Sequence, residues 1–247
     1  GHLREAMPER LAVVAETREA AADALAVWRT SGRDPRVVRG RAVTRPGKVG
    51  FVYSGNGSQW AGMGCAAYRA NAAFRNRFDQ LARGYAEIGD VMLSDALLAD
   101  DLAERLGSAS LAQPLLAVLQ IALTDALADL GLVADVVIGH SVGEVAAAHA
   151  AGILDDRQAL RVIHARSFSQ EIARGQGGMI AVAVSADEVP VLIAQCGVVS
   201  LELAAINAAN GVTLSGSTAA IGDFAAFAAA CGIVHKVLDI AYPFHSS

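Results

Sequence analysis

The chain has 247 residues and a formal net charge of −5, and 53% of its residues are hydrophobic. This length suits one large domain or a domain with a subdomain, and the apolar fraction can fill a sizeable core. The acidic balance argues against a general nucleic-acid binder. The 3 cysteines, Cys65, Cys196 and Cys231, are widely spaced, which indicates free thiols in a reducing compartment rather than a disulfide framework or a zinc site.

Residues 1–48 differ in composition from the rest of the chain. A strand-like run, Leu11–Ala15, precedes a predicted helix at Thr17–Ser31. Ser31–Pro46 is rich in arginine and contains glycine and proline, which is typical of a loop. Charged residues stand near the N-terminus where a signal peptide would have its apolar core. We therefore interpret residues 1–48 as a flanking linker, in a protein expected to be cytoplasmic.

A strand candidate, Val49–Tyr53, leads into the glycine-rich loop Ser54–Gly64. The loop lacks the Gly-Lys-Ser/Thr ending of a P-loop, so it is predicted to point a backbone N–H into a site rather than to cradle a nucleotide. Ala66–Ala86 is predicted to be helical. The acidic, amphipathic segment Asp90–Leu106 is expected on the surface.

Leu111–Leu130 is predicted to form a strongly apolar helix. Gln113 and Pro114 fall in its expected first turn, where proline is tolerated. The neutral Gln113 is either a cap or a site residue. Because Gln113 and Gln120 interrupt this apolar run, no membrane-spanning segment is predicted.

The segment around Ser141 has the pattern of a nucleophile elbow. Val136–Ile138 is a short β-branched run that predicts a buried strand, and Glu144–Ala151 is an alanine-rich predicted helix. Between them lies the pentapeptide Gly139-His140-Ser141-Val142-Gly143, a G-x-S-x-G motif. Side chains at its two glycines are expected to collide with neighbouring backbone. Ser141 is therefore a candidate nucleophile, placed before a helix N-terminus that favours negative charge.

Asp155–Arg174 is predicted to be a helix in which Arg166 continues the apolar face formed by Ala159, Val162 and Ile163. A guanidinium on such a face needs an anionic partner. A structural salt bridge and a side chain reaching out to solvent are the alternatives to a substrate-binding role.

Residues 177–238 alternate in the order strand, helix, strand, strand, helix, strand, which is the ferredoxin-like signature. The fold class is therefore predicted to be α/β: a hydrolase-like core with a parallel sheet, made by residues 49–176 and 239–247, plus this inserted βαββαβ subdomain. The predicted elements of the subdomain are Met179–Val184, Ala186–Cys196, Leu201–Ile206, Gly211–Ser215, Ala219–Cys231 and Val234–Ile240.

His245 follows this subdomain, where the chain is expected to re-enter the main domain. A serine nucleophile needs a base, and the pattern alone does not single out one histidine. The competing candidates are His140, His149, His164 and His235.

Taken together, these motifs resemble the malonyl-CoA:acyl-carrier-protein acyltransferase family, specifically the acyltransferase domain of a type I polyketide synthase. Residues 1–48 resemble the end of the linker that follows a ketosynthase domain. The matching segments, in the order of the family, are Phe51–Gly64, Ala112–Leu115, Gly139–Glu144, Ala165–Ser167, Ala205–Asn210 and Tyr242–Ser246.

The resemblance implies a two-step transfer through an acyl ester of Ser141, with His245 as general base and then general acid. It implies malonyl-CoA as donor and the phosphopantetheine thiol of an acyl carrier protein as acceptor, with no cofactor or metal bound by the domain. An adjacent ketosynthase domain is a further expected partner, and neither nucleic acid nor membrane is. The implied site residues are the backbone N–H groups of Asn56 and Val142 as oxyanion hole, Arg166 for the malonyl carboxylate, and Gln113 and His140 lining the pocket.

The tetrapeptide Tyr242-Pro243-Phe244-His245 bears on the extender unit. In the family it tends to be His-Ala-Phe-His for malonyl and Tyr-Ala-Ser-His for methylmalonyl, so this chain is a hybrid. The bulk of Phe244 favours malonyl, as does Val142, whereas Tyr242 keeps a methylmalonyl-specific domain as the alternative.

The chain departs from the family pattern at two places. Asn56 stands where the family usually has glutamine, which leaves a backbone donor intact. Family members also continue well beyond the catalytic histidine, with a backbone carbonyl orienting the imidazole, whereas this sequence ends two residues after His245. The sequence is therefore expected to be part of a longer domain.

Two rival interpretations use the same elbow. A serine hydrolase or thioesterase would need a carboxylate to orient the histidine, and water as acceptor. Arg166 on an apolar face favours an acidic acyl group over a neutral ester. An inactive acyltransferase acting as a scaffold is the second rival, against which the intact Ser141 and His245 argue. Carboxylates available to a hydrolase are Asp155, Asp156, Asp187, Asp223 and Asp239.

Overall fold

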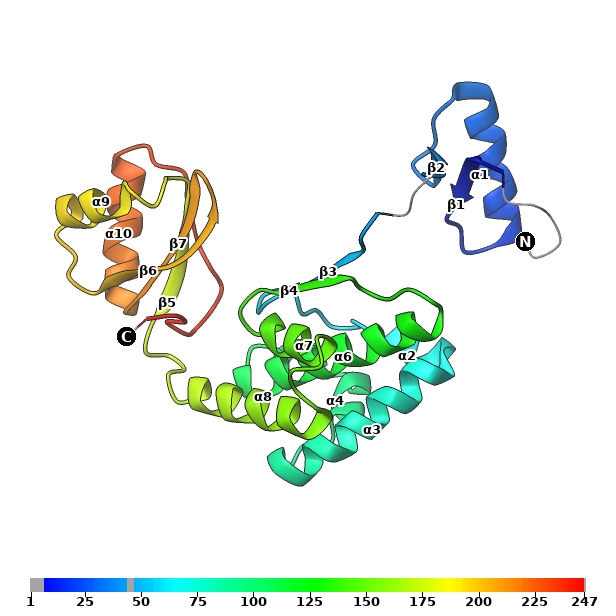
Figure 1. Ribbon diagram of the computed structural model, residues 1–247. Helices are drawn as coiled ribbons and strands as arrows, with labels where there is room; N and C mark the ends of the chain where they lie inside the picture. The colour runs from blue at the N-terminus through cyan, green and yellow to red at the C-terminus, as the bar shows by residue number, and fades with distance from the viewer. Residues whose placement is uncertain (1–6, 44–46, 247) are drawn as a thin grey trace. The chain divides into compact units, whose positions relative to one another are not determined.

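A computed structural model describes residues 7–43 and 47–246 of the chain (Figure 1). The chain divides into two compact units, Gly1–Lys48 and Val49–Ser247, and each is described by itself.

The first unit is a strand–helix–strand element rather than a strand, a helix and a loop. It contains β1 (Glu9–Val13), α1 (Arg18–Ser31) and β2 (Val37–Arg41), and β1 pairs antiparallel with β2. The Thr17 side chain caps α1 by accepting from the N–H of Ala20 at 3.1 Å. The prediction of a loop over Ser31–Pro46 is therefore wrong for β2, because pairing with β1 overrides its arginine-rich composition. Residues 44–46 lie outside the described part.

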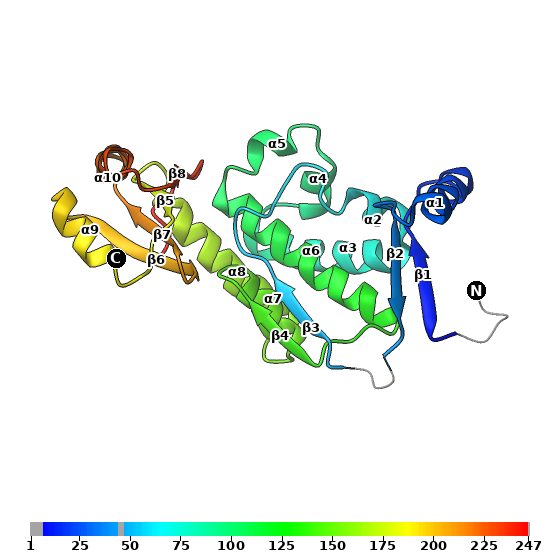
Figure 2. The same ribbon diagram turned by 90° about the horizontal axis from the view of Figure 1, so that it is seen from above.

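The core of the second unit is built from helices packed on a parallel strand pair. β3 (Gly50–Tyr53) pairs with β4 (Val136–Gly139), with Gly50 opposite Val136. Helix α7 packs against both strands, and α6 contacts β3 through the hydroxyls of Tyr53 and Thr124, which lie 2.9 Å apart (Figures 1 and 2). The helices are α2 (Cys65–Ala70), α3 (Ala72–Gly89), α4 (Leu93–Leu98), α5 (Leu102–Arg105), α6 (Ala109–Asp129), α7 (Gly143–Ala150) and α8 (Asp156–Glu171).

Two predicted segments differ from the observed helices. The helix expected over Ala66–Ala86 is broken at Asn71, whose extended backbone ends α2 and whose side chain caps α3 by accepting from the N–H of Phe74. The segment Asp90–Leu106 forms α4 and α5. Leu93, Leu97 and Leu102 of this segment are buried in the core, so the segment does not lie wholly on the surface.

The prediction that Val136–Ile138 is a buried strand is wrong in the described structure. Val136 is 54% exposed and Ile138 is 61% exposed, whereas Val137 packs against the core. The reason is the alternation of side chains along a strand, because the described residues cover only one face of the β3–β4 pair.

Helix α6 is the central helix of the core. Pro114 lies in its second turn rather than in the expected first turn. By length and composition α6 would pass as a membrane span, but 67% of its apolar window is buried inside the fold, as in the core helix of a globular protein.

The second unit also contains a βαββαβ subdomain, as predicted. Its sheet has the order β6-β7-β5-β8 with antiparallel pairing throughout. Ile180, Leu214 and Phe224 are buried between the sheet and the helices. The elements are β5 (Gly178–Val182), α9 (Val189–Cys196), β6 (Leu201–Ala208), β7 (Gly211–Gly216), α10 (Thr218–Ala230) and β8 (His235–Val237).

Candidate active site

The turn between β4 and α7 is a strained, closely packed elbow. Ser141 has φ of 53°, in the left-handed region that non-glycine residues rarely adopt. A Cβ at Gly139 would lie 2.4 Å from the backbone of Glu144, and one at Gly143 would lie 2.3 Å from the carbonyl oxygen of Tyr53. The collisions expected from the motif are therefore present, and glycine is required at both positions.

The glycine-rich loop after β3 lies directly against this elbow. A Cβ at Gly55 would be 2.6 Å from Nδ1 of His140 and 2.7 Å from its carbonyl oxygen. Within the described part of the chain, the backbone N–H groups of Asn56 and Val142 donate no hydrogen bond. Each of the two predicted oxyanion-hole donors therefore keeps a hydrogen to offer.

Ser141 and His245 lie side by side although 104 positions separate them in the sequence. The distance from Ser141 Oγ to His245 Nε2 is 3.0 Å, which is hydrogen-bonding distance. His245 has φ of 60°, and the hydroxyl of Ser246 donates to the carbonyl oxygen of Pro243, which closes the turn around the histidine. The contact to the serine singles out His245 among the candidate bases.

Three of the other histidines are engaged away from the serine. His149 contacts Asp156 at 2.9 Å, His164 lies 3.4 Å from the hydroxyl of Tyr85, and His235 contacts the carbonyl oxygen of Ile233 at 2.9 Å.

Arg166 reaches the nucleophile from α8. Its Nη2 donates to Ser141 Oγ at 2.9 Å and its Nη1 donates to Oε1 of Gln113 at 2.7 Å. Nε2 of Gln113, which is 1% exposed, donates in turn to Oε1 of Gln170 at 2.6 Å. No carboxylate of residues 7–43 or 47–246 lies within 4.0 Å of the Arg166 guanidinium, so the anionic partner expected from the sequence is not among them.

The electrostatics of the site favour a neutral histidine beside a cation. Burial lowers the pKa of His245 below its ordinary 6.5, and the charges of Arg166 and His140 lower it further, while Glu144 opposes them. Burial also lowers the pKa of Arg166, again against the charge of Glu144. A neutral His245 at physiological pH can accept a proton from the serine.

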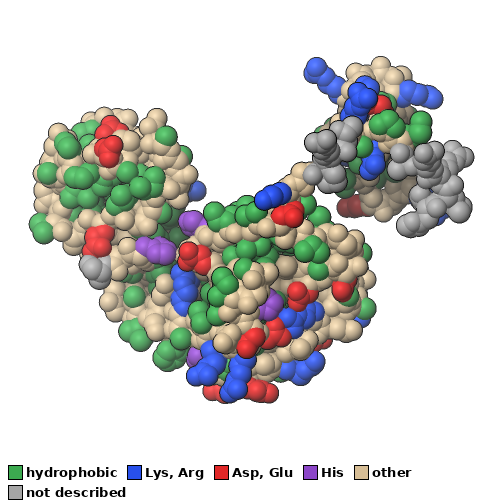
Figure 3. All heavy atoms as spheres, in the orientation of Figure 1, with side chains coloured by type: hydrophobic (Ala, Val, Ile, Leu, Met, Phe, Trp, Pro, Cys, Tyr) green, Lys and Arg blue, Asp and Glu red, His purple; other side chains and the backbone are tan. Residues whose placement is uncertain are grey.

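A cavity of about 420 Å³ opens above Ser141, where the core meets the βαββαβ subdomain. Figure 3 shows histidine, basic and acidic side chains close together on this face of the second unit. The lining residues are Asn56, His140, Ser141, Glu144, Met179, Ala204, Ala205, Asn207, Thr213, Leu238, Ile240, Phe244 and His245.

Some predicted pocket residues line this cavity and others stand behind it. Phe244 and His140 line it, whereas Gln113 lies behind Arg166 and holds its guanidinium. Tyr242 lines a smaller neighbouring cavity of about 80 Å³ and stacks on Phe244. The tyrosine of the tetrapeptide is thus a support for the wall and not part of the wall.

Sequence reasoning missed several residues of the site. Gln170 stands one helical turn after Arg166, and this i,i+4 spacing was the signal that could have found it. Glu171, which binds the hydroxyl of Tyr242, has no such signal for this contact, because Tyr242 is 71 positions away in the sequence. The subdomain pair Asn207 and Thr213, joined at 2.8 Å, also lines the cavity.

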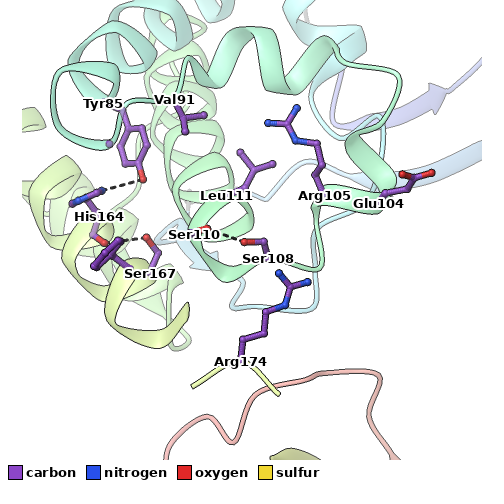
Figure 4. A pocket seen from close by; sticks show the side chains of 12 residues that line it. Tyr85, Val91, Glu104, Arg105, Ser108, Ser110, Leu111, His164, Ser167 and Arg174 are labelled. Carbon is purple, nitrogen blue, oxygen red and sulfur yellow. Dashed lines mark hydrogen bonds between the residues drawn. The ribbon is translucent and has the colours of Figure 1, made fainter. Parts of the chain in front are cut away.

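A cavity of about 560 Å³ lies on a different side of α8 and shares no lining residue with the serine site. Figure 4 shows Tyr85 pointing toward His164, and Ser108 bonded to Ser110, around this cavity. Neither Ser141 nor His245 lines it, so this larger cavity is not the candidate active site.

The comparisons with known proteins agree with this geometry. The family model described as "Acyl transferase domain" matches residues 50–247. A reducing polyketide synthase of a Penicillium species is 35% identical over 94% of this chain and 10% of its own length. The mycoketide-CoA synthase of Mycobacterium tuberculosis is 35% identical over 85% of this chain and 5% of its own length. The chain thus spans about a tenth or less of the curated relatives it matches.

Solved structures show the same likeness. The acyltransferase domain from module 8 of the salinomycin polyketide synthase has a TM-score of 0.87 and 30% identity, covering 100% of this chain and 58% of that chain. The domain from the second module of that synthase has a TM-score of 0.83 and 32% identity, covering 96% of this chain and 55% of that chain. The elbow, the family match and these structures agree, and the chain belongs to the acyl transferase domain family, as an acyltransferase domain of the polyketide synthase kind.

Proposed function

We propose that this domain moves a malonyl unit from malonyl-CoA to the phosphopantetheine thiol of an acyl carrier protein, through an ester of Ser141. The observation that carries the proposal is that one oxygen, Ser141 Oγ, lies 3.0 Å from Nε2 of His245 and 2.9 Å from Nη2 of Arg166. A nucleophile is thus placed between a neutral base and a half-buried cation, beside a cavity of about 420 Å³.

In the proposed first step, Oγ of Ser141 attacks the thioester carbonyl while Nε2 of His245 accepts the hydroxyl proton. The backbone N–H groups of Asn56 and Val142 stabilise the oxyanion. The carbon–sulfur bond then breaks, and His245 returns the proton to the CoA thiolate. The second step repeats this sequence with the carrier thiol as nucleophile and Ser141 as leaving group, so that protons and electron pairs balance.

Arg166 is proposed to bind the free carboxylate of the malonyl group. Its guanidinium contacts only neutral oxygens among the described residues, so an incoming carboxylate would supply the missing charge partner. Two structurally similar proteins, from Clostridium perfringens and Burkholderia pseudomallei, are named as malonyl transferases and are 25% and 29% identical to this chain.

Malonyl is proposed over methylmalonyl because Phe244 lines the cavity and Tyr242 does not. The phenylalanine ring occupies space that an α-methyl group would need next to the base. Residues 1–48 are proposed to be the end of a linker from a preceding ketosynthase domain, and the protein is proposed to act in the cytoplasm without a bound cofactor.

The test is to expose the protein briefly to malonyl-CoA and to measure its mass. We expect one malonyl increment on the wild type and none on Ser141→Ala, followed by loss of the increment when a carrier protein with phosphopantetheine is added. Equal acylation of the two proteins would refute the ester. Rapid release of free malonate without a carrier protein would instead favour the serine hydrolase.

A further inference from the structure

Glu171, the last residue of α8, lies at a junction of three distant segments. Its Oε2 accepts hydrogen bonds from the hydroxyl of Ser108 at 3.0 Å, the N–H of Ser110 at 3.1 Å and the hydroxyl of Tyr242 at 2.8 Å. Its Oε1 is 3.2 Å from Nη1 of Arg174. One carboxylate therefore joins the end of α8, the start of α6 and the chain segment that carries the catalytic histidine.

The hydroxyl of Tyr242 is fully committed to this junction. Tyr242 is 3% exposed, and its oxygen also accepts from the N–H of Ala109 at 3.0 Å. A phenol has one hydrogen to donate, and the ionised carboxylate at 2.8 Å is a stronger acceptor than the carbonyl oxygen of Gly107 at 3.4 Å. The hydroxyl is thus held at the N-terminus of α6 and takes no part in lining the acyl cavity.

The ring of Tyr242 couples the position of its hydroxyl to the position of Phe244, which lines the cavity. Its centroid lies 4.8 Å from that of Phe244, and the two ring planes differ by only 9°. Phe244 is 8% exposed and lines the cavity together with Ser141. Two stacked rings in a packed environment cannot tilt independently, so the position of Phe244 depends on where the tyrosine hydroxyl is held.

We propose that Glu171 is a positioning residue for acyl selection: by binding the hydroxyl of Tyr242 it fixes the Tyr242–Phe244 stack and so sets how well the cavity excludes an α-substituted malonyl group. This inference rests on the proposed function and deepens it. Neither Glu171 nor Tyr242 lines the cavity at Ser141. The hybrid tetrapeptide then has a physical explanation, since its tyrosine supports the phenylalanine instead of facing the substrate.

Gln170 and Glu171, adjacent in the last turn of α8, each hold in place a residue that supports the candidate site. Gln170 orients Gln113 and, through it, Arg166, while Glu171 orients Tyr242 and, through it, Phe244. Burial by itself would raise the pKa of Glu171. Hydrogen bonds from Ser110, Tyr242 and Ser108 outweigh it, so the net pKa lies below the ordinary 4.5 and the carboxylate stays ionised at physiological pH.

The experiment is a competition between equimolar malonyl-CoA and methylmalonyl-CoA, read as the ratio of the two acyl masses on Ser141. Tyr242→Phe removes only the hydroxyl, and Glu171→Gln removes only the charge. We expect each to lower the malonyl preference about 3- to 10-fold, less than the roughly 10–200-fold range for one methylene. The double variant should lose no more than the larger single loss, because both act through one hydrogen bond.

Phe244→Ser serves as the positive control, since opening the wall itself should admit more methylmalonyl. Glu188→Gln is the matched negative control: Glu188 also accepts from a backbone N–H and a hydroxyl, both of Ser185, but lies outside the cavity lining. It should leave the ratio unchanged.

An unchanged ratio in Tyr242→Phe, with acylation intact, would overturn the positioning role of Glu171 and leave it as a structural residue. Additive losses in the double variant would also overturn it. If Glu171→Gln failed to fold, Tyr242→Phe would decide alone, because it keeps the stacked ring. A wild type without any malonyl increment would instead count against the proposed function, which is a different result from an unchanged ratio.

Discussion

The oxygen of Ser141 has two hydrogen-bonding partners, Arg166 and His245. Arg166 has no acceptor atom, so the oxygen accepts from its Nη2, and the single hydroxyl hydrogen is left for Nε2 of His245. This arrangement needs a neutral His245 with its proton on Nδ1, and the lowered pKa of His245 favours the neutral form. In the proposed reaction, Arg166 polarises this oxygen and His245 removes its proton, as a serine that attacks a thioester requires.

Removal of the Arg166 cation should affect carboxylated acyl groups selectively. In Arg166→Ala we expect malonyl transfer to lose about 2–5 kcal/mol of transition-state stabilisation, because the malonyl carboxylate is left unpaired in a partly buried site. Acetyl transfer should fall much less. Single-turnover acylation with both CoA esters measures this, with the exposed Arg161→Ala on the same helix as control. Equal losses for the two esters would mean that Arg166 only supports the fold.

The pH dependence of acylation should report the lowered pKa of His245. Because the neutral imidazole is the active form, the rate should rise with pH through the folded pKa and level off above it. We expect the midpoint below the ordinary value of 6.5. In Arg166→Gln, loss of a nearby positive charge should move the midpoint upward. A pH profile of single-turnover acylation checks both shifts, and a wild-type midpoint above 6.5 would contradict the assignment.

Hydrogen bonds fix helix α8 at both ends, and at its C-terminal end they are made by Glu171. Asp155 and Gln158 form a capping box at its start, with bonds of 2.8 Å and 2.9 Å between side chains and backbone. Arg77 of α3 clamps the first turn through two bonds of 2.6 Å to Asp156. The helix can therefore present Arg166 to the serine from a rigid base.

Loss of the Arg77 clamp should destabilise the second unit. Arg77 also contacts Asp125 of α6 at 2.5 Å, and its side chain is 19% exposed. In Arg77→Ala two carboxylates lose their cation, and we expect the free energy of unfolding to fall by about 1–3 kcal/mol, between the values for exposed and buried pairs. Urea unfolding measures this. Arg83→Ala, an exposed position on the same helix, is the control and should change little.

The pH dependence of that loss has a defined sign. The hydrogen bond from Arg77 is the main cause that lowers the pKa of Asp156 below its ordinary 3.8. The stabilisation is therefore present above 3.8 and disappears as the pH falls through the lower folded value. If the difference in the free energy of unfolding between wild type and Arg77→Ala stayed constant into strong acid, the ion-pair explanation would be contradicted.

The inserted subdomain explains how His245 reaches Ser141 although 104 positions separate them in the sequence. Its first and last strands, β5 and β8, are neighbours in the sheet, with Ile180 opposite Val237. The chain therefore leaves and re-enters the core at nearly the same place, where the N–H of Gly175 donates to the carbonyl oxygen of Ala241 at 2.7 Å. The subdomain adds a cavity wall without displacing His245 from the elbow.

The local features of this protein could be predicted from short stretches of sequence. The elbow at Ser141, the need for glycine at position 139 and the βαββαβ order all follow from residue types within a few positions of one another. Short-range sterics and hydrophobic period govern such features, so no distant contact was needed to find them.

Other features depended on contacts between residues far apart in the chain. The sequence pattern left five histidines as possible bases, and only the tertiary fold places Nε2 of His245 at 3.0 Å from Oγ of Ser141. The strand β2 formed despite a loop-like composition because β1 supplied its partner. The direction of the Tyr242 hydroxyl was decided by Glu171, 71 positions away, since a buried polar group must find its partner wherever packing places one.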